Sequence, residues 1–458
     1  MFHKLTTFKE KISPGLWKIA SNTVWLMLER IFQMGLSLLI GFRWVALYLK
    51  PEQYGLLNYS IAFAGILGPI AKMGLDSIVV RDITRDATCK EETLGSAFGI
   101  KLVASIFTSI ITIILVSYLQ PKDYLTIALV GILTLQSIFQ ASDVIDFWFQ
   151  SEVRSKYIVW ARNIAFLLSN MIKIILILIK APLIYFAWGL LAESALIALG
   201  MAIVYRWQGN SFRGWRFNWS RAQKLVLDSW PLILSGLVIT IYMRIDQIMI
   251  GQMIGDREVG IYSAAVKISE MWYFVPIAIL SSVFPSIVKA REKSREIYYE
   301  RTQQMFDLMV LLSYSVAIPI AFFARNIVDL ILKSNESNAY AASADILIIH
   351  IWTGLFVSIG VARGSWLIAE GLMTFTAVSS AIGAAVNLIL NLYFIKVYGG
   401  LGAAFATLIA QFVASYAAHL LYPPTRIIFV MQTRAIFLID PIRILLKKLT
   451  KKADRNEK

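Results

Sequence analysis

Long apolar segments separated by short polar ones recur along the whole chain. Most apolar segments extend for about 20 residues or more, the length that a helix needs to cross the hydrocarbon core of a bilayer. Twelve can be placed, at residues 20–47, 54–78, 94–119, 123–149, 157–179, 183–205, 225–250, 258–288, 303–324, 341–368, 373–396 and 400–422. The alternating strands of about ten residues that build membrane β-barrels do not occur. The pattern therefore predicts an all-α integral membrane protein with about twelve transmembrane helices.

Motifs of the first half return in the second half about 205–220 residues later. EQYGLL at 52–57 matches REVGIY at 257–262, and FWFQSE at 147–152 matches SWLIAE at 365–370. Each half holds six predicted helices, so both halves have the same orientation in the membrane, as in transporters with parallel repeats. We expect two pseudo-symmetric six-helix bundles around a central cavity.

This repeat defines five expected parts of the chain. They are a cytoplasmic N-terminal segment (1–19), an N-terminal six-helix lobe (20–205), a cytoplasmic inter-lobe loop (206–224), a C-terminal six-helix lobe (225–422) and a cytoplasmic basic amphipathic tail (423–458). The inter-lobe loop carries Trp207, Trp215 and Trp219 among arginines, which is typical of a segment at the membrane interface. The tail alternates apolar clusters with bases, so we expect it to lie on the anionic membrane surface.

Composition supports membrane insertion and argues against an enzyme. The chain has 458 residues, of which 58% are hydrophobic and only 16% charged, whereas soluble domains carry about 25% charged residues. The single cysteine, Cys89, excludes an intrachain disulfide and a cysteine-rich metal site. The sequence contains no P-loop, no G-x-S-x-G and no H-E-x-x-H motif. We therefore expect no catalytic residue, no metal and no bound cofactor.

The net charge of +15 is explained by the orientation of the helices. With the N-terminus in the cytoplasm, the inside segments hold 29 Lys and Arg residues and the outside segments hold seven. Inside segments of multi-pass proteins are enriched in these residues, so both termini are predicted to be cytoplasmic and nucleic acid is not an expected partner.

Eight further cations fall within the apolar segments. They are Arg30, Arg43, Lys72, Arg162, Lys173, Arg244, Lys267 and Arg363. A cation at the centre of a lipid-facing helix costs about 2.5–3.5 kcal/mol on insertion scales. These residues must therefore face one another or a water-filled interior, and a cationic interior suggests an anionic cargo.

Three of these cations form a candidate ladder across the membrane, with Lys72 nearer the inner face, Arg30 near the midplane and Lys267 nearer the outer face. An alternative for Arg30 is a buried ion pair with another helix. Lys72 precedes Asp76 by four residues and Lys267 precedes Glu270 by three, so each could pair on its own helix.

Arg244 completes the candidate cavity set. Asp246 follows it by two residues on the seventh span, so the two side chains face different sides of the helix and need different partners.

The fourth span carries candidate groups for ion coupling. Its polar stripe consists of Gln136, Gln140, Asp143 and Asp146. Neighbouring carboxylates raise one another's pKa, which suits a step coupled to H⁺ or Na⁺, and Asp76 is a further candidate. The alternative is that Asp143 and Asp146 pair with Arg162 or Lys173 on the adjacent helix.

The stretch from Arg43 to Asp86 resembles a known family. It contains a span ending in L-x-x-x-x-YG and a helix running into GLDSIVVRDITRD. Both are similar to the oligosaccharide flippases of bacterial surface-polysaccharide (O-antigen) assembly. That family belongs to a superfamily that also holds multidrug extruders and the peptidoglycan-precursor flippase.

The resemblance implies two lobes in a V and alternating access. It implies a cargo of oligosaccharide on undecaprenyl diphosphate, moved from the inner to the outer leaflet of the bacterial cytoplasmic membrane. In the peptidoglycan relative, cations on the first, second and eighth spans grip the diphosphate, and Arg30, Lys72 and Lys267 occupy those spans here. Expected partners are the lipid-linked oligosaccharide and membrane lipids, with a polysaccharide polymerase and a chain-length regulator as further candidates.

Two alternative functions remain at this point. A multidrug extruder of the same superfamily would favour an acidic or neutral cavity, whereas this chain places cations in its spans. A membrane polysaccharide polymerase would be expected to present a large outer loop, and the outer loops here are short.

Overall fold

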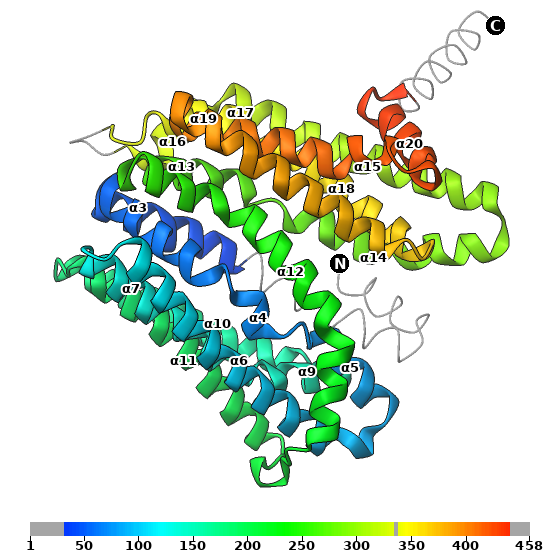
Figure 1. The fold of residues 1–458 in the computed structure, drawn as a ribbon, viewed down its shortest axis with the longest axis horizontal. Helices are drawn as coiled ribbons and strands as arrows, with labels where there is room; N and C mark the ends of the chain where they lie inside the picture. Colours follow the sequence, from blue (N-terminus) through cyan, green and yellow to red (C-terminus); the bar gives the residue numbers. More distant parts are fainter. Residues whose placement is uncertain (1–31, 334–337, 440–458) are drawn as a thin grey trace, which may run out of the picture. The chain divides into compact units, whose positions relative to one another are not determined.

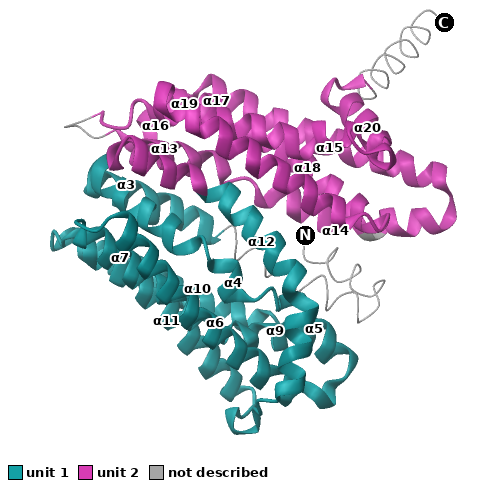
Figure 2. Ribbon diagram, in the orientation of Figure 1, with its two compact units in different colours: residues 1–244 teal, residues 245–458 magenta. Residues whose placement is uncertain are grey.

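The computed structural model describes residues 32–333 and 338–439 (Figure 1). Every regular element in this part of the chain is a helix, which confirms the predicted all-α class. The chain divides into two compact units, Met1–Arg244 and Ile245–Lys458 (Figure 2). The division falls inside a single helix, α12 (Trp219–Met253), beyond the loop at 206–224 where the lobes were expected to meet.

Unit 1 contains the helices that precede this division. In chain order they are η1 (Ser37–Trp44), α3 (Val45–Gly65), α4 (Gly68–Lys72), α5 (Asp76–Arg85), η2 (Ala87–Cys89), α6 (Lys90–Leu119), α7 (Tyr124–Thr134), α8 (Gln136–Gln140), η3 (Ala141–Asp143), α9 (Val144–Ser151), α10 (Lys156–Leu178), α11 (Leu183–Trp207), η4 (Phe212–Gly214) and the first part of α12. The helices α10 and α11 pack against each other along their lengths.

Unit 2 contains the remaining helices. They are α13 (Asp256–Glu270), α14 (Phe274–Lys293), α15 (Arg295–Phe322), α16 (Ala324–Leu332), α17 (Ser343–His350), α18 (Thr353–Ala369), α19 (Met373–Ser415), η5 (Ala417–Leu420), η6 (Pro423–Thr425) and α20 (Arg426–Ile436). Its core is built by α14, α15, α18 and α20.

The predicted number of about twelve spans agrees with the structure. In the described residues, ten helical segments are long and apolar enough to cross a membrane. Two of them contain a backbone break, at Lys50 (φ 59°) before Pro51 and at Gly399 (φ 60°). These breaks fall between predicted spans 1 and 2 and between predicted spans 11 and 12. Each long segment therefore holds two crossing helices, and the chain is a multi-pass membrane protein.

The three tryptophans of the inter-lobe loop lie in different surroundings. Trp207 and Trp219 are exposed. Trp215 instead packs against the core of unit 1, and its indole N–H donates a hydrogen bond to the Tyr205 hydroxyl at 3.1 Å. The loop is thereby fastened to α11.

The tail differs from its prediction in the part that the structure describes. Helix α20 packs on α15, with Ile428 and Ala435 buried in the core of unit 2. The buried Gln432 donates to the Ser415 carbonyl at 3.1 Å. This helix is therefore an integral part of unit 2 as well as a basic segment; residues 440–458 lie outside the described residues.

Candidate functional site

Arg30, the cation expected at the midplane, lies outside the described residues. Lys72 is exposed at the end of α4. The prediction that it shares one helix with Asp76 is wrong, because Met73 (φ 60°) and Gly74 (φ 56°) end the helix before Asp76 begins α5. A Cβ at Gly74 would lie 2.9 Å from the Leu232 Cβ, so this turn is also tightly packed. Lys72 and Asp76 are thus presented by two separate helices.

Lys101 is a membrane-buried cation that the sequence reasoning missed. The total of 29 inside charges includes it, although the predicted span 94–119 contains it; α6 begins at Lys90, so Lys101 lies about 16 Å along the helix. Its side chain is nearly inaccessible, and its Nζ lies 3.5 Å from Asp143 Oδ2 and over the ring of Phe147. A stripe of buried hydroxyl residues continues from it along one face of α6, at Ser105, Thr108 and Thr112. That stripe was visible in the sequence and marks the inward face.

The acidic stripe of the fourth span is neutralised from two sides. Arg162 Nη2 lies 2.7 Å from Asp146 Oδ2, the pairing that was one of the two alternatives for Asp146. Asp143 pairs with Lys101 on α6 rather than with a cation of α10. These carboxylates therefore take part in ion pairs within unit 1.

Lys173 and Glu193 form another ion pair in unit 1, with 3.1 Å between Nζ and Oε2. The Ser169 hydroxyl donates to the same carboxylate at 2.5 Å. This pair joins α10 to α11 and explains how a cation is accommodated in an apolar helix.

Two ion pairs hold the first part of α12 against α5. Arg81 Nη2 lies 2.8 Å from Asp228 Oδ2, and Arg221 Nη2 lies 3.2 Å from Asp82 Oδ2. Hydrogen bonds to Asp228 and Asp82 raise the pKa of the Arg81 guanidinium. The first part of α12 is thereby fixed to unit 1.

Arg244 and Asp246 fall on opposite sides of the unit division, in different surroundings. Arg244 is half-buried at the end of unit 1. Asp246 is buried in unit 2, where its Oδ2 accepts hydrogen bonds from the Tyr262 hydroxyl at 2.7 Å and from the Thr407 hydroxyl. Its Oδ1 accepts a hydrogen bond from Asn391 Nδ2 at 2.6 Å. All three donors are neutral, and no Lys or Arg of the described residues forms an ion pair with Asp246.

Further oxygens surround Asp246. Asn391 Nδ2 also donates to Asn387 Oδ1 at 3.1 Å, while Asn391 Oδ1 is buried without a hydrogen-bond partner. Carboxylate, amide and hydroxyl oxygens from α12, α13 and α19 therefore converge on one buried point, a donor set suited to a hard cation or a proton. Sequence reasoning did not select this site, although Asn387 and Asn391 are four residues apart in an apolar span.

Lys267 stands out on α13 because its neighbours are buried. Val259 to Val266, Ile268 and Ser269 are all buried, whereas Lys267 is exposed. Unit 2 thus presents a cation from the otherwise buried stretch 259–269 of α13.

Two other intramembrane cations are less exposed. The buried Arg363 donates to the Ser379 hydroxyl at 3.0 Å and to the Ala414 carbonyl, which ties α18 to α19. Arg43 is half-buried in η1. Arg363 therefore has a structural role. The eight predicted intramembrane cations thus do not all belong to one site.

The fold and these charged helices define a multi-pass membrane protein with ionised groups inside its helical units. Residues 19–291 match the family model described as polysaccharide biosynthesis protein, and residues 231–393 match the MatE model. The first match covers more than half of the chain, so the chain belongs to the polysaccharide biosynthesis protein family. This confirms the resemblance found in the sequence.

Curated relatives extend over most of the chain. The capsular polysaccharide biosynthesis protein CapF of Staphylococcus aureus is 22% identical, over 81% of this chain and 91% of the relative. The probable low-salt glycan biosynthesis flippase Agl15 of Haloferax volcanii is 24% identical, over 85% of this chain and 80% of the relative. The first relative is named for capsular polysaccharide biosynthesis, and the second is named as a probable flippase of glycan biosynthesis.

Solved structures show the same fold. A multidrug resistance MATE family transporter of the MOP superfamily, in its inward-facing conformation, gives a TM-score of 0.70 at 15% identity, covering 88% of this chain and 95% of that one. The lipid II flippase MurJ gives a TM-score of 0.63 at 14% identity, covering 93% of each chain. The fold is therefore that of the MOP-superfamily transporters.

Proposed function

We propose that this protein moves an oligosaccharide carried on undecaprenyl diphosphate from the inner to the outer leaflet of a bacterial cytoplasmic membrane, by alternating access. The product would be O-antigen or a related surface polysaccharide. The observation that carries the proposal is Lys267, an exposed cation on a helix whose neighbouring side chains are buried. A lysine within a membrane span is far more stable facing water than lipid. Lys72 in unit 1 is also exposed, at the end of α4, and Arg30 and Arg244 complete the proposed set.

A diphosphate suits these cations chemically. Charge-assisted hydrogen bonds from Lys and Arg would offset the desolvation of the phosphates while the prenyl tail stays in lipid. An inside-negative potential favours outward movement of an anion by about 2.3 kcal/mol per elementary charge per 100 mV. Transport driven by the membrane potential needs no nucleotide. Membrane lipids surround the protein. A polysaccharide polymerase and a chain-length regulator remain proposed partners.

The rival function is multidrug extrusion, which the MatE match over residues 231–393 favours. Exposed lysines would repel cationic drugs, so they support an anionic cargo instead.

The first test measures transfer between leaflets in proteoliposomes that contain a fluorescent glycan on undecaprenyl diphosphate. We expect Lys72→Ala, Lys267→Ala and Arg30→Ala each to slow transfer about 10–100-fold, the equivalent of one charge-assisted contact. Arginine in place of either lysine should retain part of the rate. Lys122→Ala, in an exposed loop, is the matched control and should transport normally. A Lys267→Ala protein with the normal rate would contradict the proposal, as would efflux of cationic dyes instead of glycan transfer.

We further propose that H⁺ or Na⁺ drives the cycle through Asp246. The earlier candidates are less suitable, since Asp143 and Asp146 pair with Lys101 and Arg162, and Asp76 is exposed. A buried carboxylate with only neutral donors gains most from a proton or a small cation.

The second test imposes Na⁺ or pH gradients across the same proteoliposomes. The normal protein should transport faster with one of the two gradients, and Asp246→Asn should transport at one rate under all conditions. Asp143→Asn serves as the control and should keep the gradient dependence. If Asp246→Asn still responds to the gradient, the coupling site lies elsewhere.

A further inference from the structure

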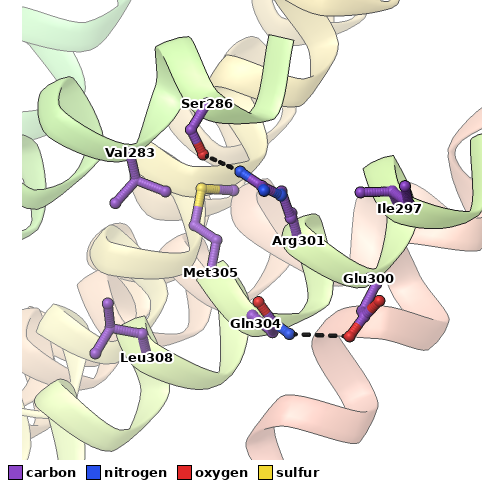
Figure 3. Close-up of a pocket in the computed structure, with 8 residues that line it drawn as sticks. All are labelled: Val283, Ser286, Ile297, Glu300, Arg301, Gln304, Met305 and Leu308. Carbon is purple, nitrogen blue, oxygen red and sulfur yellow. Dashed lines mark hydrogen bonds between the residues drawn. The ribbon is translucent and has the colours of Figure 1, made fainter. Parts of the chain in front are cut away.

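A groove runs between α14 and α15 on the surface of unit 2 (Figure 3). Its volume is about 450 Å³, within the roughly 300–1,000 Å³ range of small-molecule sites. Its lining consists of Val283, Ser286, Ile297, Glu300, Arg301, Gln304, Met305 and Leu308. None of these residues belongs to the proposed transport or coupling sites.

The polar part of the groove holds one positive and one negative group. Arg301 Nη1 donates to the Ser286 hydroxyl at 2.8 Å, and Gln304 Nε2 donates to Glu300 Oε1 at 3.2 Å (Figure 3). Arg301 and Glu300 are both exposed, and neither forms an ion pair with another described residue. The guanidinium carries five N–H donors, so several remain available to a ligand.

The apolar part lies beside these groups. Val283, Met305 and Leu308 are drawn on one side of the arginine in Figure 3. Leu308 follows Arg301 by seven residues on α15, which is about 10 Å along the helix axis. The polar end adjoins the segment 289–301, which carries five Lys and Arg residues, whereas α15 continues as an apolar span to Phe322. The groove therefore leads from the level of lipid headgroups toward the hydrocarbon.

We propose that this groove binds phosphatidylethanolamine. Arg301 and the Ser286 hydroxyl would hold the phosphate, and Glu300 with Gln304 Oε1 would accept hydrogen bonds from the ammonium group. Val283 and Leu308 would contact the acyl chains. A purely anionic headgroup would meet repulsion from Glu300, and the quaternary ammonium of phosphatidylcholine has no N–H to donate. The charge pattern thus selects a zwitterionic headgroup with a primary amine.

The test titrates purified full-length protein in detergent with single lipids and counts bound molecules by native mass spectrometry. Phosphatidylethanolamine should bind about tenfold more tightly than phosphatidylglycerol or phosphatidylcholine, the effect of one charged hydrogen bond. Soluble phosphoethanolamine should compete poorly, because it lacks the acyl chains. Equal binding of all three lipids, or full competition by soluble phosphoethanolamine, would overturn the proposal.

Two variants test the phosphate contact and the ammonium contact separately. Arg301→Gln should weaken phosphatidylethanolamine and phosphatidylglycerol alike, whereas Glu300→Gln should remove the preference between them. Arg295→Gln and Glu296→Gln are matched controls, since both residues are exposed at the same hairpin but do not line the groove. A thermal unfolding profile of each variant verifies its fold. Unchanged lipid preference in Glu300→Gln, or equal loss in the control variants, would refute the assignment.

Discussion

The two residues of the Arg162–Asp146 ion pair differ in exposure. The Asp146 side chain is 7% exposed, whereas its partner Arg162 is 32% exposed. A partner that can reach water tolerates separation, but a buried carboxylate left alone does not. The two residues therefore contribute unequally to stability although they share one contact.

This difference predicts an asymmetric pair of variants. Arg162→Ala leaves Asp146 buried and unpaired, and should lower the free energy of unfolding by about 3–5 kcal/mol. Asp146→Ala leaves a guanidinium that can turn toward water, and should lower it by about 1–2 kcal/mol. Denaturation of the detergent-solubilised proteins measures both values. The double variant should lose less than the sum of the two, and equal losses in the single variants would contradict the argument.

The roles of individual side chains were the part of the structure that the sequence predicted least completely. Sequence reasoning found Asp146, Arg162 and Lys173 as membrane-embedded charges, because a charge within an apolar segment is visible in one dimension. It counted Lys101 among the inside charges, although the predicted span 94–119 already contains that residue. It noted that Asp246 needs a partner other than that of Arg244 but did not select it as a site, because two of its three partners lie 145 and 161 residues away along the chain. No local pattern reveals such a contact.

Among the elements, α19 depends most on glycine. The backbone changes direction at Gly399, so that residues on either side of it meet. A Cβ at Gly402 would lie 2.1 Å from the Phe394 carbonyl oxygen, a backbone atom that cannot move aside. This approach fixes the angle between the last two crossing helices.

We therefore expect Gly402→Ala to destabilise unit 2 by about 1–3 kcal/mol, the usual effect of overpacking. Gly364→Ala is the matched control, because a Cβ there meets nothing within 4 Å and alanine favours a helix by about 1 kcal/mol. Thermal unfolding followed by tryptophan fluorescence distinguishes the two. Equal melting temperatures for both variants would show that the helix junction adapts without strain.

Helices themselves were largely predictable, because hydropathy over about 20 residues is a strong signal. The interruptions inside them were not. Met73 adopts a left-handed conformation, which is unusual for a residue with a side chain, and this break separates Lys72 from Asp76. Gly74 continues the turn at φ 56°, and a Cβ there would lie 2.9 Å from the Leu232 Cβ, a long-range approach that no local pattern reveals.

For the molecule as a whole, the distribution of charge predicts the topology. Without Lys101, which lies within α6, the inside segments hold 28 of the 29 Lys and Arg residues first counted there, against seven outside. Both termini should then lie in the cytoplasm, as the positive-inside tendency requires.

Cysteine labelling tests this topology. Cys89→Ser gives a background without thiols and keeps a hydrogen-bond acceptor for Arg221. In that background, Lys122→Cys should react with a membrane-impermeant maleimide added to spheroplasts. Arg213→Cys, also exposed, should react only after the membrane is permeabilised. The reverse labelling pattern would show that the chain is inserted with its termini outside.

The hydrogen bonds of Asp246 also have a consequence for the time course of biosynthesis. The ribosome adds Asp246 to the nascent chain long before Thr407, which follows 161 residues later. At about 5–20 residues per second, translation needs about 8–32 s to supply that hydroxyl. During this interval the nascent chain carries an acidic side chain with Tyr262 available but its two other hydrogen-bond donors not yet made. Chains that terminate prematurely before Asn391 would leave this carboxylate with one of its three donors, a mark by which membrane proteases could recognise and remove them.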